Sequence, residues 1–187
     1  MKWLLLTEKM TFVDMDKYPS LKRYYGAEPK VLVRRVISRQ DKIMATHTNE
    51  RVVFKKDINP FLIIDSKWNP LFVLGILNSK LISYLYVNIS SIATKDDFRQ
   101  TTLAELRRIP VRKINFDNRD DKSMHNKMVK LVDRMLDLHK KLAKAKIPSD
   151  KTKLQRQINS TDSAIDNLVY ELYDLTTAEI AIIQKSS

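Results

Sequence analysis

The sequence predicts an α+β chain, in which a basic, β-rich segment with packed helices (residues 1–116) precedes an antiparallel α-helical hairpin (residues 117–187). Short β-branched runs separated by turn residues fill residues 31–65, whereas apolar residues recur at steps of three and four from residue 124 onward. Charge divides in the same way: residues 1–116 carry 21 basic and 11 acidic residues, and residues 117–187 carry 13 and 11. Ten of the twelve excess positive charges therefore belong to the β-rich part.

Four short strands are predicted in the β-rich part, each rich in β-branched residues or alternating between apolar and polar ones. They span residues 31–37, 42–47, 51–55 and 61–65. The polar breaks between them are short, which predicts an antiparallel meander.

Two helices are predicted after the strands. Asn69 is a good helix cap and Pro70 suits the first helical position, so the apolar region up to residue 93 is interpreted as one buried amphipathic helix. Its predicted buried stripe comprises Leu74, Leu77, Leu81, Tyr84 and Leu85. A capping box from Thr102 to Glu105 predicts a short second helix, which Pro110 ends.

The tail predicts two helices joined at residues 147–150, a connection short enough to make them antiparallel. Heptad spacing defines a seam in each helix, and Thr161 is the polar member of the second seam. The apolar seam residues are Met124, Met128, Leu131, Met135, Leu138 and Leu142, then Leu154, Ile158, Ile165, Leu168 and Leu172. Val132, Ile147 and Val169 lie just off the seam, so we expect this surplus to dock onto the β-rich domain or a catalytic partner. A capping box from Thr176 to Glu179 opens a terminal helix.

The composition argues against catalysis by this chain alone. It has two glycines and no cysteine, which excludes a glycine-rich phosphate loop, a disulfide framework and a thiol nucleophile. Three scattered histidines predict no metal site. Asn59-Pro60 and Asn69-Pro70 both lack the second proline of an amino-group methyltransferase motif, and the carboxylates near Lys30 make a poor nuclease constellation.

No export or membrane signal is recognisable. The apolar run after Met1-Lys2 is four residues long and then meets Glu8 and Lys9. We therefore expect a cytoplasmic protein that does not associate with membranes.

The basic excess predicts a polyanionic partner, and duplex DNA fits best. The candidate contacts are basic residues on strands, turns and helix ends, together with a polar loop predicted at residues 46–49. They are Arg34, Arg35, Arg39, Lys42, Thr46, His47, Asn49, Arg107, Arg108, Arg112 and Lys113. Each also has an ordinary interpretation as a solvated or ion-paired side chain.

Two other functions remain open. One is a helical protein–protein interaction module whose basic charge is incidental. The other is an RNA-binding module, disfavoured because aromatic residues make up only 8% of the chain and form no strand motif.

Several stretches in combination resemble the TaqI-like C-terminal specificity domain, the target recognition domain of type IIG restriction–modification enzymes and DNA adenine methyltransferases. They are Lys30-Val31-Leu32-Val33-Arg34-Arg35, residues 42–46, Leu74-Gly75-Ile76-Leu77-Asn78-Ser79-Lys80, residues 81–84 and 106–111, and tail stretches between residues 131 and 173. The resemblance covers roughly residues 30–180.

The resemblance implies that the β-rich part reads DNA while methylation and cleavage reside in other domains or in a separate subunit. S-adenosylmethionine and magnesium are expected only there. Base-reading residues vary within the family, so none is assigned by resemblance. The hairpin resembles the spacer helices of type I specificity subunits, which implies docking onto a catalytic partner; a homodimer is the other arrangement left open.

Overall fold

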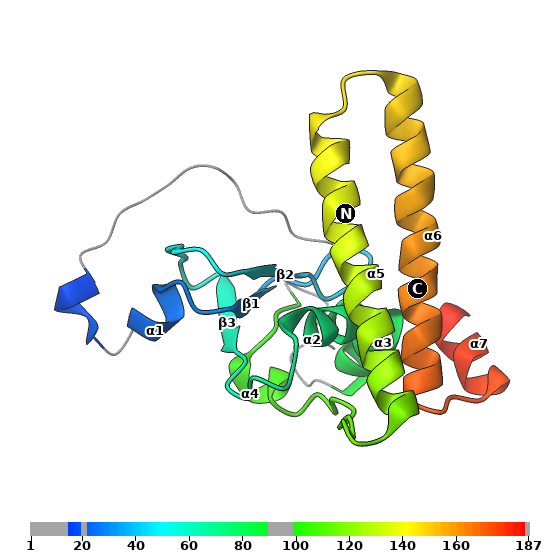
Figure 1. Cartoon of the computed structure of the whole chain (residues 1–187), viewed down its shortest axis with the longest axis horizontal. Helices are drawn as coiled ribbons and strands as arrows, with labels where there is room; N and C mark the ends of the chain where they lie inside the picture. Colours follow the sequence, from blue (N-terminus) through cyan, green and yellow to red (C-terminus); the bar gives the residue numbers. More distant parts are fainter. Residues whose placement is uncertain (1–14, 20–21, 90–98, 186–187) are drawn as a thin grey trace.

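The computed structural model describes residues 15–19, 22–89 and 99–185. It confirms the predicted α+β class: a small antiparallel sheet is covered by short helices, and a long helical hairpin stands beside them (Figure 1). The short elements are η1 (Met15–Lys17), α1 (Lys22–Tyr25), β1 (Lys30–Arg34), β2 (Ala45–Thr48), β3 (Ile58–Leu62), α2 (Pro70–Leu77), α3 (Lys80–Ile89) and α4 (Leu103–Leu106). The hairpin is α5 (Arg119–Lys144) and α6 (Pro148–Leu172), followed by α7 (Thr177–Lys185).

The predicted four-stranded meander is wrong for the described sheet, which has three strands in the order β2-β1-β3. The buried strand β1 is central and pairs antiparallel with both neighbours. Residues 51–55 form no strand, because Phe54 packs on Tyr25 with ring centroids 4.7 Å apart instead of joining a ladder. The connection from β2 therefore passes β1 and returns as β3 on the opposite edge.

The predicted single helix beginning at Pro70 is two helices, α2 and α3, bent by 59° at their junction. Asn69 caps α2 as predicted, since its Oδ1 accepts a hydrogen bond from Leu71 N at 2.9 Å. The bend falls at Asn78 and Ser79, whose polar side chains are fully buried and hydrogen-bonded to backbone atoms. Continuous apolar spacing concealed this break. The predicted stripe runs through it, and residues 90–93 lie outside the described residues.

The hairpin packs on α2 through α5 and on α3 through α6, with a second stripe of apolar residues beside its seam. Val132 and Val169 are fully buried, whereas Ile147 at the tip is 58% exposed. A Cβ atom added to Gly75 would lie 2.5 Å from Met128 Sδ and 2.9 Å from Val132 Cγ2. Glycine at this position therefore permits the close approach of α2 and α5.

The seam residues form one core with the sheet and α2. Met128, Met135, Leu138, Ile158, Thr161, Ile165, Leu168 and Leu172 are buried, and Met124, Leu131, Leu142 and Leu154 are half-buried. The lower half of the hairpin lies against α2 and α3, and its upper half projects beyond them (Figure 1). The buried carboxylate of Asp166 on α6 accepts from Lys80 N at 2.9 Å, which fixes the start of α3 to the hairpin.

Within the described ranges, no individual helix has the length and apolar content to cross a membrane; only the bent pair α2 and α3 meets that test when taken together. Most of the apolar residues of this pair are buried in or packed against the core.

Candidate nucleic-acid interface

A basic groove of about 690 Å³ lies beside the edge strand β3. Four cationic residues line it, and no acidic residue does so within the described part of the chain. The cations are Arg23 on α1, Lys55 and Lys56 in the loop before β3, and Arg107 after α4. The remaining lining residues are Tyr24, Tyr25, Phe54, Ile58, Pro60, Phe61, Leu62, Ile64 and Leu103. The basic groove thus combines an apolar floor with a positive rim.

Aromatic contacts shape one wall of the basic groove. The ring of Tyr25 packs on Phe54 at an interplanar angle of 45°, and the Tyr25 hydroxyl donates to Phe54 O at 3.5 Å. The Arg23 guanidinium lies 5.5 Å from the ring centroid of Tyr24. The contacts of Tyr25 with Phe54 connect α1 to the loop that presents Lys55 and Lys56.

The floor and the opposite wall come from β3 and α4. Ile58, Pro60 and Leu62 alternate onto one face of the strand. Pro60 offers no backbone N–H, which suits an edge strand. Leu103 on the opposite wall is 40% exposed, and α4 begins with a cap in which Thr102 Oγ1 accepts from Glu105 N, as predicted. Apolar side chains therefore remain accessible between the cations.

The adjacent residues Arg34 and Arg35 lie in different environments. Arg34 is the register partner of Ile58, and directly paired residues project to the same face, so Arg34 lies on the side of the groove floor. It is exposed. Arg35 is half-buried, and its Nε donates to Gln100 Oε1 at 3.0 Å. The structure thus makes Arg34 available for a ligand and places Arg35 in an internal contact.

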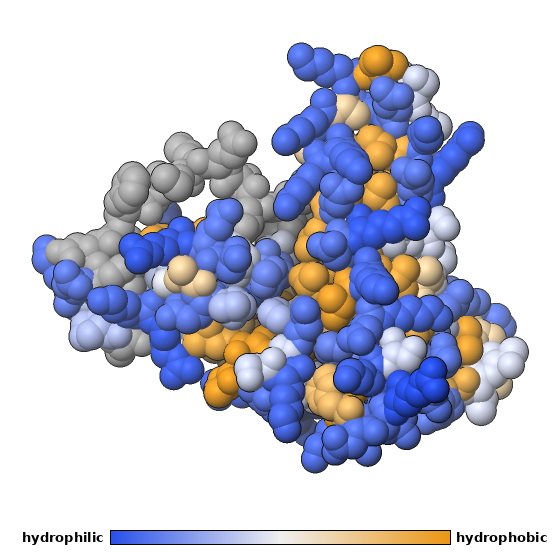
Figure 2. Space-filling model, viewed as in Figure 1, coloured by the Kyte–Doolittle hydropathy of each residue, from blue (hydrophilic) through white to orange (hydrophobic). Residues whose placement is uncertain are grey.

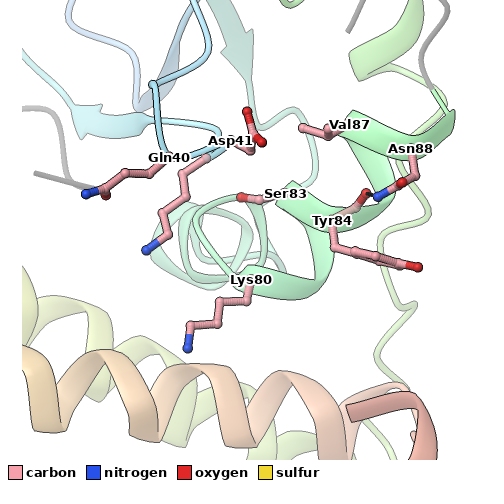
Figure 3. Close-up of a pocket in the computed structure, with 8 residues that line it drawn as sticks. Gln40, Asp41, Lys80, Ser83, Tyr84, Val87 and Asn88 are labelled. Carbon is pink, nitrogen blue, oxygen red and sulfur yellow. Dashed lines mark hydrogen bonds between the residues drawn. The ribbon is translucent and has the colours of Figure 1, made fainter. Parts of the chain in front are cut away.

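The turn carrying Arg39 and Lys42 is held by hydrogen bonds. Ser38 Oγ accepts from Gln40 N at 3.3 Å and Lys42 N at 3.1 Å, and Asp41 has a φ of 56° and pairs with Arg99. Arg39 is exposed and Lys42 is half-buried. A neighbouring pocket over α3 measures only about 30 Å³ (Figure 3). In that view Ser83 points from α3 toward the turn, and its Oγ accepts from Ile43 N at 3.2 Å. The pocket has room for about one water molecule and no cofactor.

The predicted polar loop at residues 46–49 is wrong, because residues 46–48 belong to β2. Thr46 is 4% exposed and His47 is half-buried, so only Asn49 of the three candidates is exposed. Burial and the neighbouring Lys30 lower the pKa of His47. Burial also lowers the pKa of Lys30, whose ammonium donates to three backbone carbonyls. The acceptors are those of Gly26, Glu28 and Glu50.

The basic residues around Pro110 divide similarly. Arg107 lines the basic groove, and Arg108 and Lys113 are exposed. Arg112 is half-buried, and its NH2 lies 3.5 Å from Asp121 Oδ1. Its backbone N–H donates to the Tyr173 hydroxyl at 3.2 Å, which in turn donates to Pro110 O at 2.6 Å. Arg112 therefore helps to attach this segment to the hairpin.

Sequence reasoning missed Arg23, Lys55 and Lys56. The Phe54-Lys55-Lys56 sequence was the available signal, but its apolar neighbours suggested a strand. Among residues 15–19, 22–89 and 99–185, no group of three or more His, Asp or Glu side chains is placed to hold a metal ion.

Comparison with known proteins bears on the same region. The family model of the TaqI-like C-terminal specificity domain matches residues 7–111, which include β1–β3 and α2–α4 and end before α5. A protein of Methanocaldococcus jannaschii named as a type II restriction enzyme and methyltransferase is 46% identical over 104 residues. The aligned part is 54% of this chain and 9% of that protein.

Proposed function

Because the chain belongs to the TaqI-like C-terminal specificity domain family, we propose that it recognises a specific duplex DNA sequence as the specificity module of a restriction–modification enzyme. Methylation and cleavage are then carried out by other domains or another subunit, where S-adenosylmethionine and magnesium bind. This assignment places the chain in the cytoplasm, where cellular DNA is accessible.

The basic groove is the observation that carries this proposal. Its cations Arg23, Lys55, Lys56 and Arg107 have no acidic neighbour in the described lining, so a phosphate backbone is the complementary ligand. Arg34 on the same face of the sheet is the first candidate for base reading, because a guanidinium can bind guanine through two hydrogen bonds in the major groove. Exposed Asn49, which can pair with adenine in the same way, is the second.

Four cations outside the basic groove could extend this interface, of which Arg39, Arg108 and Lys113 are exposed and Lys42 is half-buried. Arg39, Lys42, Arg108 and Lys113 remain candidates for phosphate contacts. Arg35, Thr46, His47 and Arg112 make internal contacts or are largely buried, so we assign them to the support of the interface.

We further propose that the projecting tip of the hairpin docks onto the catalytic part of the enzyme. Leu142 and Leu154 are half-buried near the tip, and Ile147 is 58% exposed. This exposed apolar side chain stands between the exposed Lys144 and Lys151 on an arm that projects beyond α2 and α3, where a partner could reach it (Figure 1). Replacing Ile147 with Lys should weaken association with the catalytic chain; formation of a homodimer that the same substitution disrupts would instead identify a second copy as the partner.

Selection from a random pool tests DNA recognition. The full chain is incubated with random-sequence duplexes, and bound duplexes are recovered and sequenced over several rounds. A recurring short site is expected. A pool that stays random while the protein binds it would show sequence-independent binding and refute the specificity role.

A further inference from the structure

The helix α5 carries an exposed basic face that is separate from the basic groove. Eight residues line a shallow surface along it, at successive spacings of three and one. They are Arg119, Lys122, Ser123, Asn126, Lys127, Lys130, Leu131 and Arg134. All except half-buried Leu131 are exposed. The α5 basic face, defined by its five cations, extends over about 22 Å at 1.5 Å per residue.

Residues 117–187 carry nearly equal numbers of basic and acidic residues, so their summed charge does not reveal the α5 basic face. Among the acidic residues of α5, Asp121 accepts from Asn115 N at 2.8 Å and lies beside Arg112, and Asp137 pairs with Lys141 at 2.7 Å. Asp120 and Asp133 are exposed, but neither is among the described residues that line this surface. Folding therefore gathers five cations on one side of α5, where Asp133, seven residues after Asn126, adds one carboxylate and leaves the surface positive on balance.

We propose that the α5 basic face binds the phosphate backbone of DNA flanking the recognised site. The inference rests on the proposed function, since it assumes that DNA is the ligand of the chain. It adds a second contact surface on the hairpin, which the family match does not cover.

Charge complementarity favours phosphates over a protein partner. Leu131 is the single apolar residue on this surface, whereas the centre of a stable protein–protein interface is apolar and depleted in lysine. In Figure 2, hydrophilic side chains cover the sides of the hairpin, and hydrophobic side chains show between them. A row of exposed cations suits an array of phosphates, whose neutralisation releases counterions.

Phosphate contacts position a protein without reading sequence. Removing them should weaken binding to every duplex alike and leave the preference for the selected site unchanged.

Two charge-matched triple variants of the full chain test the inference. The first replaces Lys122, Lys127 and Lys130 with Ala on the α5 basic face. The control replaces exposed Lys151, Lys153 and Arg156 with Ala on α6, which removes the same charge from the same hairpin. Circular dichroism and urea unfolding should show that both remain folded. Equilibrium binding is then measured across a range of salt concentrations, with the selected duplex and a scrambled duplex of equal length.

The α5 variant should lower the slope of log K against log salt by up to about 2.7, because each phosphate that is no longer neutralised lowers it by about 0.9. The α6 variant should lower the slope by less than about 0.9, the value for a single phosphate. The inference would be overturned if the α5 variant kept the slope and affinity of the wild type, or if both variants showed equal reductions. If the α5 variant kept full DNA affinity but bound an acidic protein more weakly, that class of protein would be the occupant.

The results distinguish failure of the α5 contact from failure of the proposed function. If the wild type prefers the selected duplex and the α5 variant binds DNA as the wild type does, only the α5 contact is refuted. If the α5 variant has a lower affinity and salt slope but the wild type shows no sequence preference, only the specificity role is refuted. A wild-type chain that binds neither duplex refutes both.

Discussion

The side chain of Asn78 makes hydrogen bonds to both backbone polar groups of Ala45. Its Oδ1 accepts from Ala45 N at 2.9 Å, and its Nδ2 donates to Ala45 O at 3.1 Å. Ala45 begins β2, an edge strand, and Asn78 is fully buried at the bend between α2 and α3. The amide therefore satisfies the edge of the sheet as a neighbouring strand would, and it joins the sheet to the helical layer.

Replacing Asn78 with Ala should lower the free energy of unfolding by about 2–4 kcal/mol, because two buried backbone groups lose their partners. Urea unfolding measures the loss, and hydrogen exchange should report faster exchange of the Ala45 amide. The matched control is Asn88→Ala, since Asn88 is exposed and, among the described residues, its Nδ2 donates to Tyr84 O within α3. Equal effects of the two substitutions would contradict the role assigned to Asn78.

Gly75→Ala should destabilise the chain by about 1–3 kcal/mol through overpacking, although alanine favours helix formation more than glycine. The new Cβ would press on Met128 and Val132. A double-mutant cycle with Val132→Ala measures the coupling, and a smaller cost of Gly75→Ala in that background is expected. Additive effects would mean that α2 and α5 do not meet as described.

The sequence predicted those features that depend on local chemistry. Asn69 and Thr102 are capping residues whose side chains bond to the next turn, so the starts of α2 and α4 could be located without tertiary information. The hairpin followed from heptad spacing. By contrast, the polar residues Asn78, Ser79 and Lys80 interrupt the apolar run at the bend, but the partner of the Asn78 side chain lies 33 positions away, so the interruption alone did not predict two helices.

The candidate DNA contacts were only partly predictable for the same reason. Arg34 and Arg35 were both candidates, but the position of Arg34 beside the groove depends on the pairing of β1 with β3. Lys55 and Lys56 were missed because residues 51–55 resemble a strand. The contact between Tyr25 and Phe54 is what places this loop at the groove.

The two adjacent arginines should behave differently on substitution. Arg34→Ala should weaken binding to the selected duplex and relax the preference at one base pair, at a cost of about 1–3 kcal/mol, with little change in stability. Arg35→Ala should chiefly affect stability, because it removes the hydrogen bond to Gln100. Binding measurements with duplexes varied at each position, together with urea unfolding, separate the two outcomes. The reverse assignment of effects would place DNA on the other face of the sheet.

Acid should destabilise the packed hairpin through His139 on α5. This residue is 5% exposed, and neither ring nitrogen has a hydrogen-bond partner within the described structure. Burial lowers the pKa of His139 below its ordinary value, although nearby Asp162 opposes the shift. The unfolded chain therefore binds the proton more readily, and stability falls as the pH drops below about 6.5 toward the folded-state pKa.

His139→Leu should reduce this acid dependence while retaining buried volume. Urea unfolding between pH 7.5 and pH 5, done for the wild type and the variant, measures the difference. Burial also lowers the pKa of His47, so a residual dependence is expected. An equally steep acid dependence in the variant would show that groups other than His139 cause the loss of stability at low pH.

The most direct test of the central claim compares the wild-type chain with a variant carrying Lys55→Ala, Lys56→Ala and Arg107→Ala, on the selected duplex and on its scrambled counterpart at several salt concentrations. The wild type should prefer the selected duplex by about 10³-fold or more. The variant should bind both duplexes more weakly, with a salt slope lower by up to about 2.7. Equal wild-type affinity for the two duplexes, or a variant that binds with unchanged affinity and slope, would contradict recognition of DNA through the basic groove.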